Sequence, residues 1–229
     1  MVNRITQIMA TSTVENYLKA ALLYEQEHQG IVPMGALVEA LGVVPGTVTT
    51  MVKAMATQGL LEHEVRQGVR LTPVGRALAL GVLRKHRLVE TFLVQTLEMD
   101  WSEVHVEAEA LEHAVSNRVL ERIDAYLGHP TVDPHGDPIP NAEGSIADEA
   151  TQATMQDCTI KKPLRVTRIL DQSADFLDYV QDHGLKPGAK IEVLKRVEAS
   201  GVLQCALADG EEIVLGLPAA AKIIVGISA

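Results

Sequence analysis

The stretch VPGTVTTMVKAMATQGLLEHEVRQGVRLTPVGRALA, residues 44–79, decides the fold of the first part of the chain. Pro45 suits the first turn of a helix, and Gly59 ends that helix. Between them the apolar residues return at the spacing of one helical face: Val48, Met51, Val52 and Met55. Two alternating segments then flank a turn at residues 66–68, which predicts a two-stranded wing. Thr72 caps the helix that follows.

The sequence before this stretch predicts two further helices. Residues 12–28, STVENYLKAALLYEQEH, repeat apolar side chains at helical spacing, and a shorter helix in GALVEALGV, residues 35–43, stops at Gly42. Two short helices joined by a tight glycine-containing turn and followed by a wing are typical of a winged helix-turn-helix. We assign this fold to residues 1–80. An ordinary small helical bundle is the alternative that the pattern leaves open.

A long helix is predicted over residues 78–97, where His86 and Glu90 lie four positions apart and so share a face. Its apolar side chains are more numerous than one helix can bury against a small domain: Leu83, Leu88, Phe92, Leu93 and Leu97. This excess fits a dimer interface, and packing inside one subunit would give the same pattern.

The stretch HVEAEALEHAVSN, residues 105–117, concentrates carboxylate and imidazole side chains. Neither Gly nor Pro interrupts it, so a helix is predicted with Ser102 as its N-cap, and the residues up to Gly128 continue or restart that helix. Four side chains then form one stripe: His105, Glu109, Glu112 and His113. Carboxylates and imidazoles on one face suit a divalent cation. A solvated acidic face is the alternative, and Glu107 is expected to be solvated.

Composition and charge narrow the class of protein. Residues 81–160 contain five Lys or Arg and fifteen Asp or Glu, whereas the flanking segments are balanced, so this segment carries the whole net charge of −10. An acidic segment favours cations or a solvated face. Aromatic content of 3% argues against base-stacking platforms, and no apolar run reaches membrane-spanning length. Without a signal-peptide pattern, and with two cysteines outside metal-ligand spacing, the protein is expected to be cytoplasmic, with no membrane partner and no disulfide.

The C-terminal part of the chain changes character twice. Residues 129–160 are rich in Pro and Gly near their start, which predicts an irregular linker whose His129 and His135 are not metal ligands. From residue 163 the apolar residues alternate with period two between glycine turns, apart from one short acidic helix, which predicts a small SH3-like barrel. We therefore expect a mostly α fold with a C-terminal β module.

Four segments follow from these patterns. Residues 1–80 are expected to form the winged helix-turn-helix DNA-binding domain, and residues 81–145 a helical domain for metal binding and dimerisation. Residues 146–160 are expected to be a linker, and residues 161–229 the SH3-like module, of the kind also called FeoA-type.

The order and spacing of these segments resemble the diphtheria-toxin-repressor family of metal-dependent transcriptional regulators along nearly the whole chain. The motifs that carry the resemblance are STVENYL (12–18), GTVTTMVKAM (46–55), LTPVGRALA (71–79), RKHRLVETFL (84–93), EVHVEAEALEHAVS (103–116) and GDPIPN (136–141). The resemblance implies a homodimer that binds a double-stranded DNA operator and represses metal-uptake genes when metal is abundant. It implies that the protein is not an enzyme.

The resemblance also implies two metal positions in each subunit. Carried over by position, the ligands of the first are Asn16, Glu109, Glu112 and His113. The ligands of the second are His86, Glu90 and His105. In longer members of the family the SH3-like module adds ligands to the second position, and the matching stretch QSADF nominates Gln172 and Asp175.

Glu109 bears on the identity of the metal. Iron-responsive members carry a sulfur-containing residue where this chain has Glu109 and Met where it has Asn16, whereas manganese-responsive members tend to have carboxylates at both. Glu109 therefore favours Mn²⁺ over Fe²⁺, while Asn16 matches neither branch. A site of oxygen and nitrogen ligands suits either ion, and it would bind Ni²⁺, Co²⁺ or Zn²⁺ at least as tightly.

The recognition helix and the wing are expected to face DNA. The residues expected to contact bases or phosphates are Thr47, Thr49, Thr50, Lys53, Arg66 and Arg70. Two other classes of protein remain as alternatives: a di-metal carboxylate enzyme and a metal-independent winged-helix regulator. The enzyme is disfavoured because such bundles pair an acid-and-His motif on each of two helices, whereas one helix carries it here.

Overall fold

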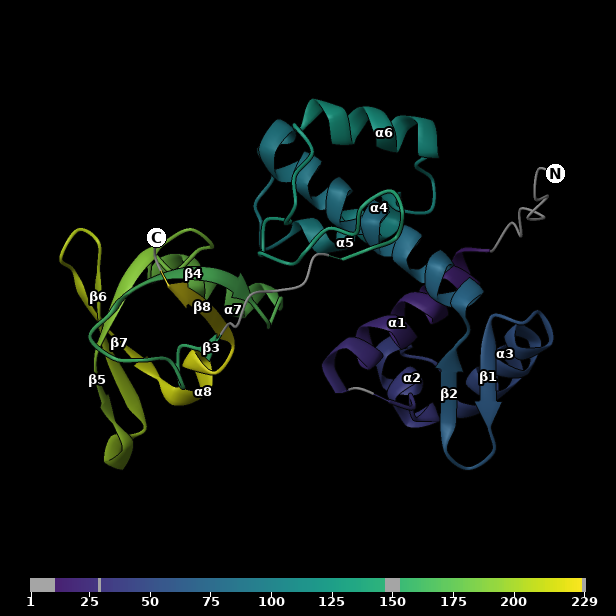
Figure 1. Ribbon diagram of the computed structural model, residues 1–229, viewed down its shortest axis with the longest axis horizontal. Coiled ribbons are helices and arrows are strands. Elements are labelled where there is room, and N and C mark those ends of the chain that lie inside the picture. The colour runs from purple at the N-terminus through teal and green to yellow at the C-terminus, as the bar shows by residue number, and fades with distance from the viewer. Residues whose placement is uncertain (1–10, 29, 147–152, 228–229) are drawn as a thin grey trace. The chain divides into compact units, whose positions relative to one another are not determined.

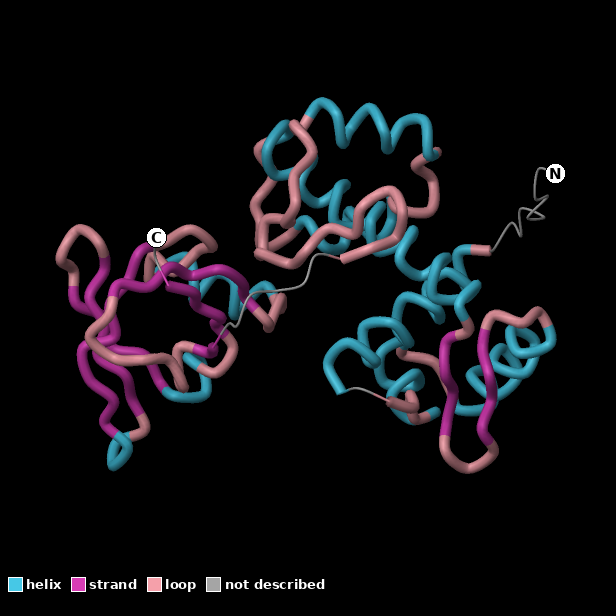
Figure 2. The backbone as a smooth tube through the Cα atoms, viewed as in Figure 1, coloured by secondary structure: helices cyan, strands magenta, loops and turns pink. Residues whose placement is uncertain are grey.

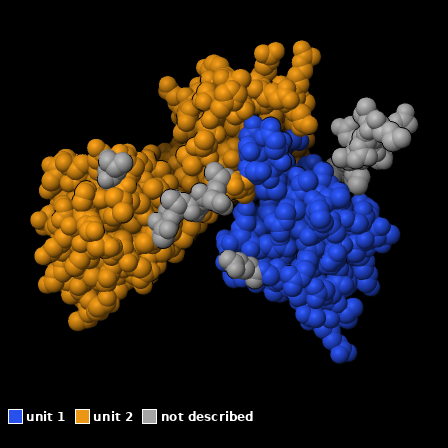
Figure 3. Space-filling view, in the orientation of Figure 1, with its two compact units in different colours: residues 1–85, 140–145 blue, residues 86–139, 146–229 orange. Residues whose placement is uncertain are grey.

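The computed structural model describes residues 11–28, 30–146 and 153–227. The chain divides into two compact units (Figure 3). The first comprises residues 1–85 and 140–145, and the second comprises residues 86–139 and 146–229. The division therefore falls inside a helix, several residues after the boundary expected at residue 80, and a short segment near residue 140 returns to the first unit.

The first unit contains the predicted winged helix-turn-helix (Figure 1). Its elements are α1 (Ser12–His28), α2 (Met34–Leu41), α3 (Pro45–Thr57), β1 (Leu61–Glu64), β2 (Gly68–Leu71) and the start of α4 (Pro73–Leu97). Gly42 ends α2 in the left-handed conformation, with φ 62°, which is the glycine cap expected from the sequence. Apolar side chains from all three leading helices and both strands form one core, which includes Leu18, Leu22, Leu37, Val52, Met55 and Val69.

The wing is a two-stranded antiparallel hairpin that is anchored at its base. Leu61 pairs with Leu71, and Val32 and Val69 exchange backbone hydrogen bonds of 2.9 Å in each direction. Gly68 makes this approach possible, because a Cβ there would lie 2.1 Å from the carbonyl oxygen of Val32. The wing is therefore fixed to the segment between α1 and α2, while its tip extends beyond the core.

The second unit begins with the C-terminal half of α4, followed by α5 (Val104–Leu111) and α6 (Asn117–Tyr126). Val89 and Leu93 of α4 pack against Val104 and Ala108 of α5, so these two helices lie side by side. Leu120 of α6 joins a second apolar cluster with α4. This packing brings the acidic and imidazole side chains of α4 and α5 to one place.

The helix predicted over residues 105–117 is shorter than expected. α5 ends at Leu111, although Glu112 keeps helical dihedral angles of φ −56° and ψ −31°. Ser116 then restarts the chain as α6, because its hydroxyl accepts a hydrogen bond from the N–H of Val119. Glu112 therefore keeps its place on the stripe, whereas His113 lies in the turn between two helices.

The predicted N-cap of α5 was also wrong. Ser102 does not cap the helix, since its N–H and its hydroxyl both donate to the carboxylate of Asp100. The residue in the cap position is Glu103, whose side chain makes no capping hydrogen bond. A local turn at Asp100 has replaced the expected cap.

The segment expected to be an irregular linker after residue 128 is irregular in shape but packed. Asp133, His135, Asp137 and Ile139 are all buried. The expected linker at residues 146–160 also differs, because β3 (Ala153–Thr154) already pairs with the last strand of the β module. Residues 147–152 lie outside the described part of the chain.

The C-terminal β module is a six-stranded antiparallel sheet in the order β3-β8-β4-β5-β6-β7. Its strands are magenta in Figure 2. Its remaining elements are β4 (Pro163–Ile169), α7 (Ala174–Asp182), β5 (Lys190–Val197), a 3-10 turn (Glu198–Ser200), β6 (Val202–Leu207), β7 (Glu212–Gly216), α8 (Leu217–Ala220) and β8 (Ile223–Ile227). The alternating side chains of these strands fill an apolar interior that also holds the free thiols of Cys158 and Cys205. A mostly α fold with a C-terminal β module is thus confirmed.

Among the described residues, no single helix has the length and apolar character to cross a membrane. Only α2 and α3 taken together have them, and these two helices are bent by 112°.

Candidate metal centre

Buried charged and imidazole side chains are concentrated in one part of the second unit. Within the described ranges they are His86, Arg87, Glu90, Glu112, Asp133, His135 and Asp137, and the first unit adds Lys19. Burying such groups costs free energy unless they are paired, hydrogen-bonded or bound to a metal. Three sets of side chains, which add the half-buried Glu109 and the exposed His105 to these buried groups, place their ligand atoms within 4.8 Å of one another, which is close enough to share a cation.

The first set joins α4 to the end of α5. The Nδ1 atom of His86 lies 2.6 Å from Oε2 of Glu112 and 3.9 Å from Oε1 of Glu109. His86 and Glu112 are buried, while the Glu109 side chain is 36% exposed and so leaves an opening on one side. His113 lies next to this set, with its Nε2 atom 3.3 Å from Oε1 of Glu112.

His86 fits the set that the family resemblance implies, since its ligand atom lies within 4.8 Å of those of Glu90 and His105, but it also contacts the first set. The resemblance assigns His86 to the second metal position, yet its Nδ1 faces the carboxylates of the first set. Its other nitrogen, Nε2, lies 2.9 Å from Oε1 of Glu90. His86 therefore stands between the two predicted positions, and the spacing of residues along α4 could not distinguish which of them it serves.

The second set surrounds Glu90. Its Oε1 atom lies 3.2 Å from Nδ1 of His105 as well as 2.9 Å from His86, and the two imidazole rings meet edge to face at 4.8 Å. Burial alone would raise the pKa of Glu90, but hydrogen bonds with His105 and His86 outweigh burial and lower that pKa. Glu90 is thus held as a carboxylate, which is the form that binds a cation.

The third set adds two residues that the sequence reasoning did not include, Asp133 and His135. His135 is fully buried, and its Nδ1 atom lies 3.9 Å from Oε2 of Glu90. Its Nε2 atom lies 2.8 Å from the carbonyl oxygen of Trp101. A carbonyl only accepts, so Nε2 carries a proton, and in the neutral ring Nδ1 keeps a lone pair. That Nδ1 makes no hydrogen bond to any described residue.

Asp133 completes the third set. Burial, together with the nearby carboxylates of Asp137 and Glu90, raises the pKa of Asp133 well above its usual range. A positive charge among these groups would relieve that repulsion. The expectation that His135 is a loop residue outside the site therefore does not match its surroundings, whereas His129 is largely exposed and pairs with Asp124 at 2.9 Å.

The two residues nominated from the β module are not members of the three sets, which consist of histidines and carboxylates. Asp175 is exposed in the first turn of α7. The side-chain amide of Gln172 donates to Oδ2 of Asp137 at 2.5 Å. Neither residue contributes an atom to the three clusters in the described part of the chain, so their role as ligands stays a prediction.

Asn16 belongs to the first unit, on the partly buried face of α1. Its Oδ1 atom is buried and accepts no hydrogen bond from any residue that the structure describes. An orphaned amide oxygen of this kind fits a metal ligand, because a cation would satisfy it.

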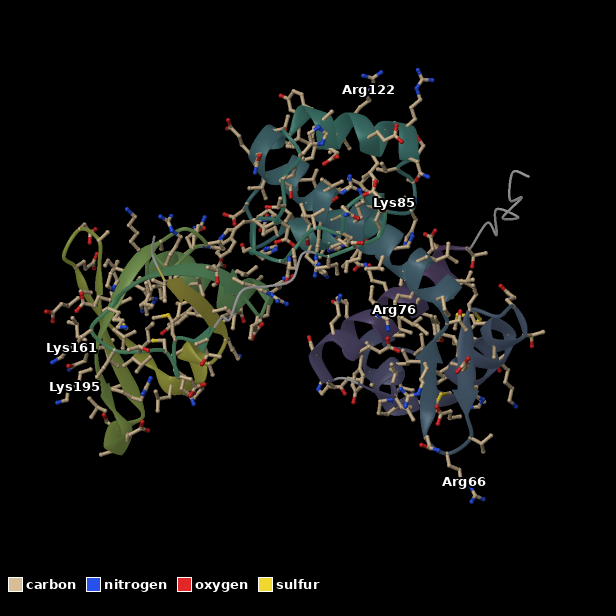
Figure 4. The ribbon with its side chains drawn as sticks, in the orientation of Figure 1. Arg66, Arg76, Lys85, Arg122, Lys161 and Lys195 are labelled. Atoms are coloured by element: carbon tan, nitrogen blue, oxygen red, sulfur yellow. The ribbon has the colours of Figure 1, made fainter. Side chains whose placement is uncertain are left out.

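The residues expected to contact DNA lie mainly on the surface of the first unit. Thr47, Thr50 and Lys53 are exposed on α3, and Arg66 extends from the tip of the wing (Figure 4). Thr49 is half-buried, and its hydroxyl donates to the carbonyl of Pro45 at 3.0 Å. The sixth residue, Arg70, is exposed but pairs with Glu64 at 2.9 Å. Arg66 thus offers a less encumbered positive charge than Arg70.

The clustered donors fit a divalent cation. Carboxylate oxygens and imidazole nitrogens suit hard or borderline ions such as Mn²⁺, Fe²⁺ and Zn²⁺. The unsatisfied Nδ1 of His135 and Oδ1 of Asn16 are two atoms for which the described structure supplies no donor. The donor chemistry alone does not choose among these ions.

Comparison with protein families gives three matches that follow one another along the chain. Residues 9–69 match the N-terminal DNA-binding domain of iron-dependent repressors, and residues 72–141 match the metal-binding and dimerisation domain of the same proteins. Residues 153–226 match the FeoA domain.

Curated relatives match over most of their length. The iron-dependent repressor IdeR of Mycobacterium tuberculosis is 34% identical over 193 residues, which cover 79% of this chain and 83% of IdeR. The diphtheria toxin repressor of Corynebacterium diphtheriae is 30% identical over 194 residues, covering 80% of this chain and 85% of that protein.

Solved structures match the whole architecture. A manganese-dependent transcriptional repressor in complex with manganese superposes with a TM-score of 0.84 and 40% identity, covering 94% of this chain and 100% of that one. The repressor ScaR with bound Cd²⁺ gives a TM-score of 0.75 and 34% identity, covering 94% of this chain and 99% of that one.

Proposed function

The chain belongs to the iron-dependent and diphtheria-toxin repressor family, whose members are metal-dependent transcriptional repressors and not enzymes, and from this premise we propose that its physiological metal is Mn²⁺. The protein is a metal-dependent, DNA-binding repressor. The proposal concerns which ion it senses, which residues hold that ion, and how the ion changes DNA binding. We keep as part of it the division into residues 1–80 and 81–145, followed by a linker and by the β module, which begins at Ala153 and not at residue 161 because β3 pairs with β8.

The observation that carries the proposal is the first set of ligands. His86, Glu109 and Glu112 converge within 4.8 Å, and His113 lies beside them. Each of these side chains is an oxygen or nitrogen donor, and Glu109 supplies a carboxylate where iron-responsive relatives carry sulfur. A sulfur-free set favours a hard ion, which supports Mn²⁺ over Fe²⁺. The match to a manganese-dependent repressor at 40% identity agrees with this choice.

Raw affinity does not set the choice of metal. The same donors bind Zn²⁺ at least as tightly as Mn²⁺ by the Irving–Williams order. ScaR, which is described as manganese-activated, has also been solved with bound Cd²⁺ and with bound Zn²⁺. Selectivity for Mn²⁺ would therefore come from coordination number, geometry and the supply of ions in the cell.

A second cation position is centred on Glu90. His86 faces both groups, with its Nδ1 toward the first set and its Nε2 toward Glu90, so it does not by itself define the second position. We therefore assign the second position to Glu90, Asp133 and His135, which are all buried. The family resemblance nominates His86, His105, Gln172 and Asp175 as further ligands there. Each subunit would hold two cations.

Residues of this chain would couple cation binding to DNA binding. Asn16 on α1 stays a predicted ligand of the first position through the family resemblance, and a cation bound in this way would restrict how the DNA-binding helices are held in the homodimer. Two recognition helices must reach successive major grooves about 34 Å apart, so a small change in their placement costs affinity. A bound cation supplies the positive charge that offsets the clustered carboxylates. Because linkage is reciprocal, DNA should in turn tighten cation binding.

At the DNA, the start of α3 would meet base edges or phosphates through Thr47, Thr49 and Thr50. Lys53, Arg66 and Arg70 would contact phosphates, and such contacts position the protein without reading sequence. The cytoplasmic repressor would then repress metal-uptake genes when the ion is abundant.

Metal-dependent DNA binding tests the proposal. Fluorescence anisotropy with labelled DNA from upstream of a metal-uptake gene should show tight binding with Mn²⁺ and weak binding with a chelator. Glu112→Ala should abolish the response to Mn²⁺, because it removes the buried carboxylate that faces His86. Glu107→Ala, on the exposed side of the same helix, is the matched control and should respond like the parent. An unchanged Mn²⁺ response in Glu112→Ala would refute the site assignment.

A further inference from the structure

The loop that carries Asp133 and His135 is closed by its own backbone and side chains. The N–H of Asp133 donates to the carbonyl of Asp137 at 2.9 Å. The Oδ1 atom of Asp133 accepts the N–H groups of His135 and Asp137 at 2.8 and 2.9 Å. The orientation of both proposed ligands therefore depends on where this closed loop is held.

Strand β4 of the β module holds the backbone of the loop. The N–H of Ile169 donates to the carbonyl of His135 at 2.9 Å. Gly136 has a φ of +89°, and a Cβ there would lie 2.0 Å from the carbonyl oxygen of Thr167. Contact this close requires glycine, so the middle of the loop is pressed directly against the strand.

Two side chains of the β module hold the far end of the loop through Asp137. The Nε atom of Arg168 lies 2.6 Å from Oδ1 of Asp137, and the amide of Gln172 donates to Oδ2 at 2.5 Å. Arg87 of α4 approaches the same carboxylate at 3.6 Å. The Asp137 side chain is 9% exposed, so the two ion pairs and the hydrogen bond from Gln172 are largely shielded from water.

We propose that Arg168 and Gln172 are positioning residues that set the cation affinity of the second position by clamping Asp137, without themselves binding the cation. The inference rests on the proposed function, since it concerns the position formed by Glu90, Asp133 and His135. It gives Gln172 a role different from the ligand role that the family resemblance implies. The β module would thereby tune the second position through the loop.

The geometry of Gln172 favours the clamp. Its Nε2 group donates to the carboxylate of Asp137, so the contact that Gln172 makes with the loop is a hydrogen bond and not a metal bond. Partners that orient metal ligands typically change metal affinity by about 10- to 100-fold when they are removed. A change of that size, confined to the second position, is the signature expected of a positioning role.

The first experiment counts Mn²⁺ ions per subunit and their affinities in the full-length protein by isothermal titration calorimetry. The parent should bind two ions, and Arg168→Ala should weaken one of them by about 10- to 100-fold while leaving the other unchanged. Arg168→Lys, which keeps a positive charge, should recover part of the loss. Arg165→Ala, on the same strand but directed to the carbonyl of Gly188, is the matched control and should leave both affinities unchanged.

The second experiment separates a clamp from a ligand by the sign of one effect. In Gln172→Glu, a carboxylate faces the carboxylate of Asp137, so a clamp predicts weaker Mn²⁺ binding at the second position. If Gln172 were a ligand, the added carboxylate would instead tighten binding. Because glutamate has nearly the same size and shape as glutamine, this variant also guards against a general loss of folding in Arg168→Ala.

The outcomes distinguish the clamp from the proposed function. Two ions in the parent, one in Glu90→Ala, and unchanged affinities in Arg168→Ala would overturn the clamp and leave the function standing. Tighter binding in Gln172→Glu would overturn the clamp in the same way. Only one ion in the parent would remove the second position and the clamp together, while DNA binding that depends on Glu112 would keep the first position.

Discussion

The β module and the helical part of the second unit have opposite interiors. The β module buries apolar side chains, and no charged residue between 161 and 227 is buried in the part that the structure describes. The helical part encloses seven charged or imidazole side chains between residues 86 and 137. The first kind of interior stabilises itself by removing apolar surface from water, whereas the second is costly until a cation or partner offsets its charges. The difference predicts that cations stabilise the helical part and leave the apolar interior of the β module unchanged, apart from the contacts of β4 and Gln172 with the loop at residues 133–137.

The largest effect expected is a loss of stability in the β module. Leu215 is fully buried in its core, so Leu215→Ala should destabilise the module by roughly 2–5 kcal/mol through lost burial and a cavity. The adjacent Val214 is 57% exposed, and Val214→Ala should cost far less. Chemical denaturation measures both changes. Mn²⁺ affinity at the first position should be the same in both variants, and a loss there would show that the two interiors are not independent.

Removal of the cation should have the next largest effect, in the opposite region. At a free Mn²⁺ concentration one hundred times the dissociation constant, each cation stabilises the folded state by about 2.7 kcal/mol. Hydrogen exchange measured by mass spectrometry should therefore show slower exchange in α4 and α5 with Mn²⁺ than with a chelator. Strands β5 and β6 should exchange at the same rate in both conditions. Equal protection of all four elements would contradict the comparison.

A single ligand should contribute less than the whole set. His113→Ala should weaken Mn²⁺ binding at the first position by about tenfold, equivalent to roughly 1.4 kcal/mol, because a neighbouring imidazole donor is lost. His129→Ala removes an exposed imidazole that pairs with Asp124, so it serves as the matched control. Calorimetric titration of both variants measures the difference. Equal affinities would place His113 outside the site.

The smallest effect is expected at the thiol of Cys205, whose reactivity Mn²⁺ should not change. Burial, reinforced by the neighbouring Cys158, raises the pKa of Cys205 to about 11, so little thiolate exists at pH 8. A thiol reagent should therefore react slowly with the native protein and quickly after unfolding. Mn²⁺ should leave the native rate unchanged, since the thiol lies in the apolar interior. A rate that depends on Mn²⁺ would show coupling between the two interiors.

The raised pKa of Cys205 also gives a dependence on pH. The neutral thiol is favoured in the folded state, so the stability it contributes is fully present below the ordinary thiol pKa of 9.0, which applies to the unfolded chain. That contribution is lost as the pH rises from about 9 toward 11, because the unfolded chain ionises first. Denaturation of Cys205→Ala across this window should show a weaker loss of stability than the parent shows.

The sequence predicted the elements of the fold well because each is encoded locally. Pro45 starts α3, Gly42 ends α2, and the alternating residues from 163 onward form strands of the β module. The errors arose where tertiary contacts decide the outcome. α5 ends at Leu111, and Ser116 caps a new helix. The hydroxyl of Ser102 donates to the carboxylate of Asp100 and therefore does not cap α5.

The candidate site was partly predictable for the same reason. Glu109 and Glu112 lie three residues apart along a helical path, so local periodicity nominated them. His86 and Glu90 lie four apart on one face of α4, and the family resemblance assigned this pair to a metal position. Asp133 and His135 lie in a proline-rich loop without periodicity, and only tertiary packing brings them beside Glu90. The alternation of Asp133, His135 and Asp137 was the one signal in the sequence that could have indicated them.

The most direct test of the central claim is anomalous X-ray diffraction from crystals grown with Mn²⁺, recorded on both sides of the manganese absorption edge. The strongest anomalous peak should lie within bonding distance of His86 Nδ1 and the carboxylates of Glu109 and Glu112. A second peak should lie beside Glu90, Asp133 and His135. Peaks found only at exposed acids, with none at the buried carboxylate of Glu112, would contradict the account.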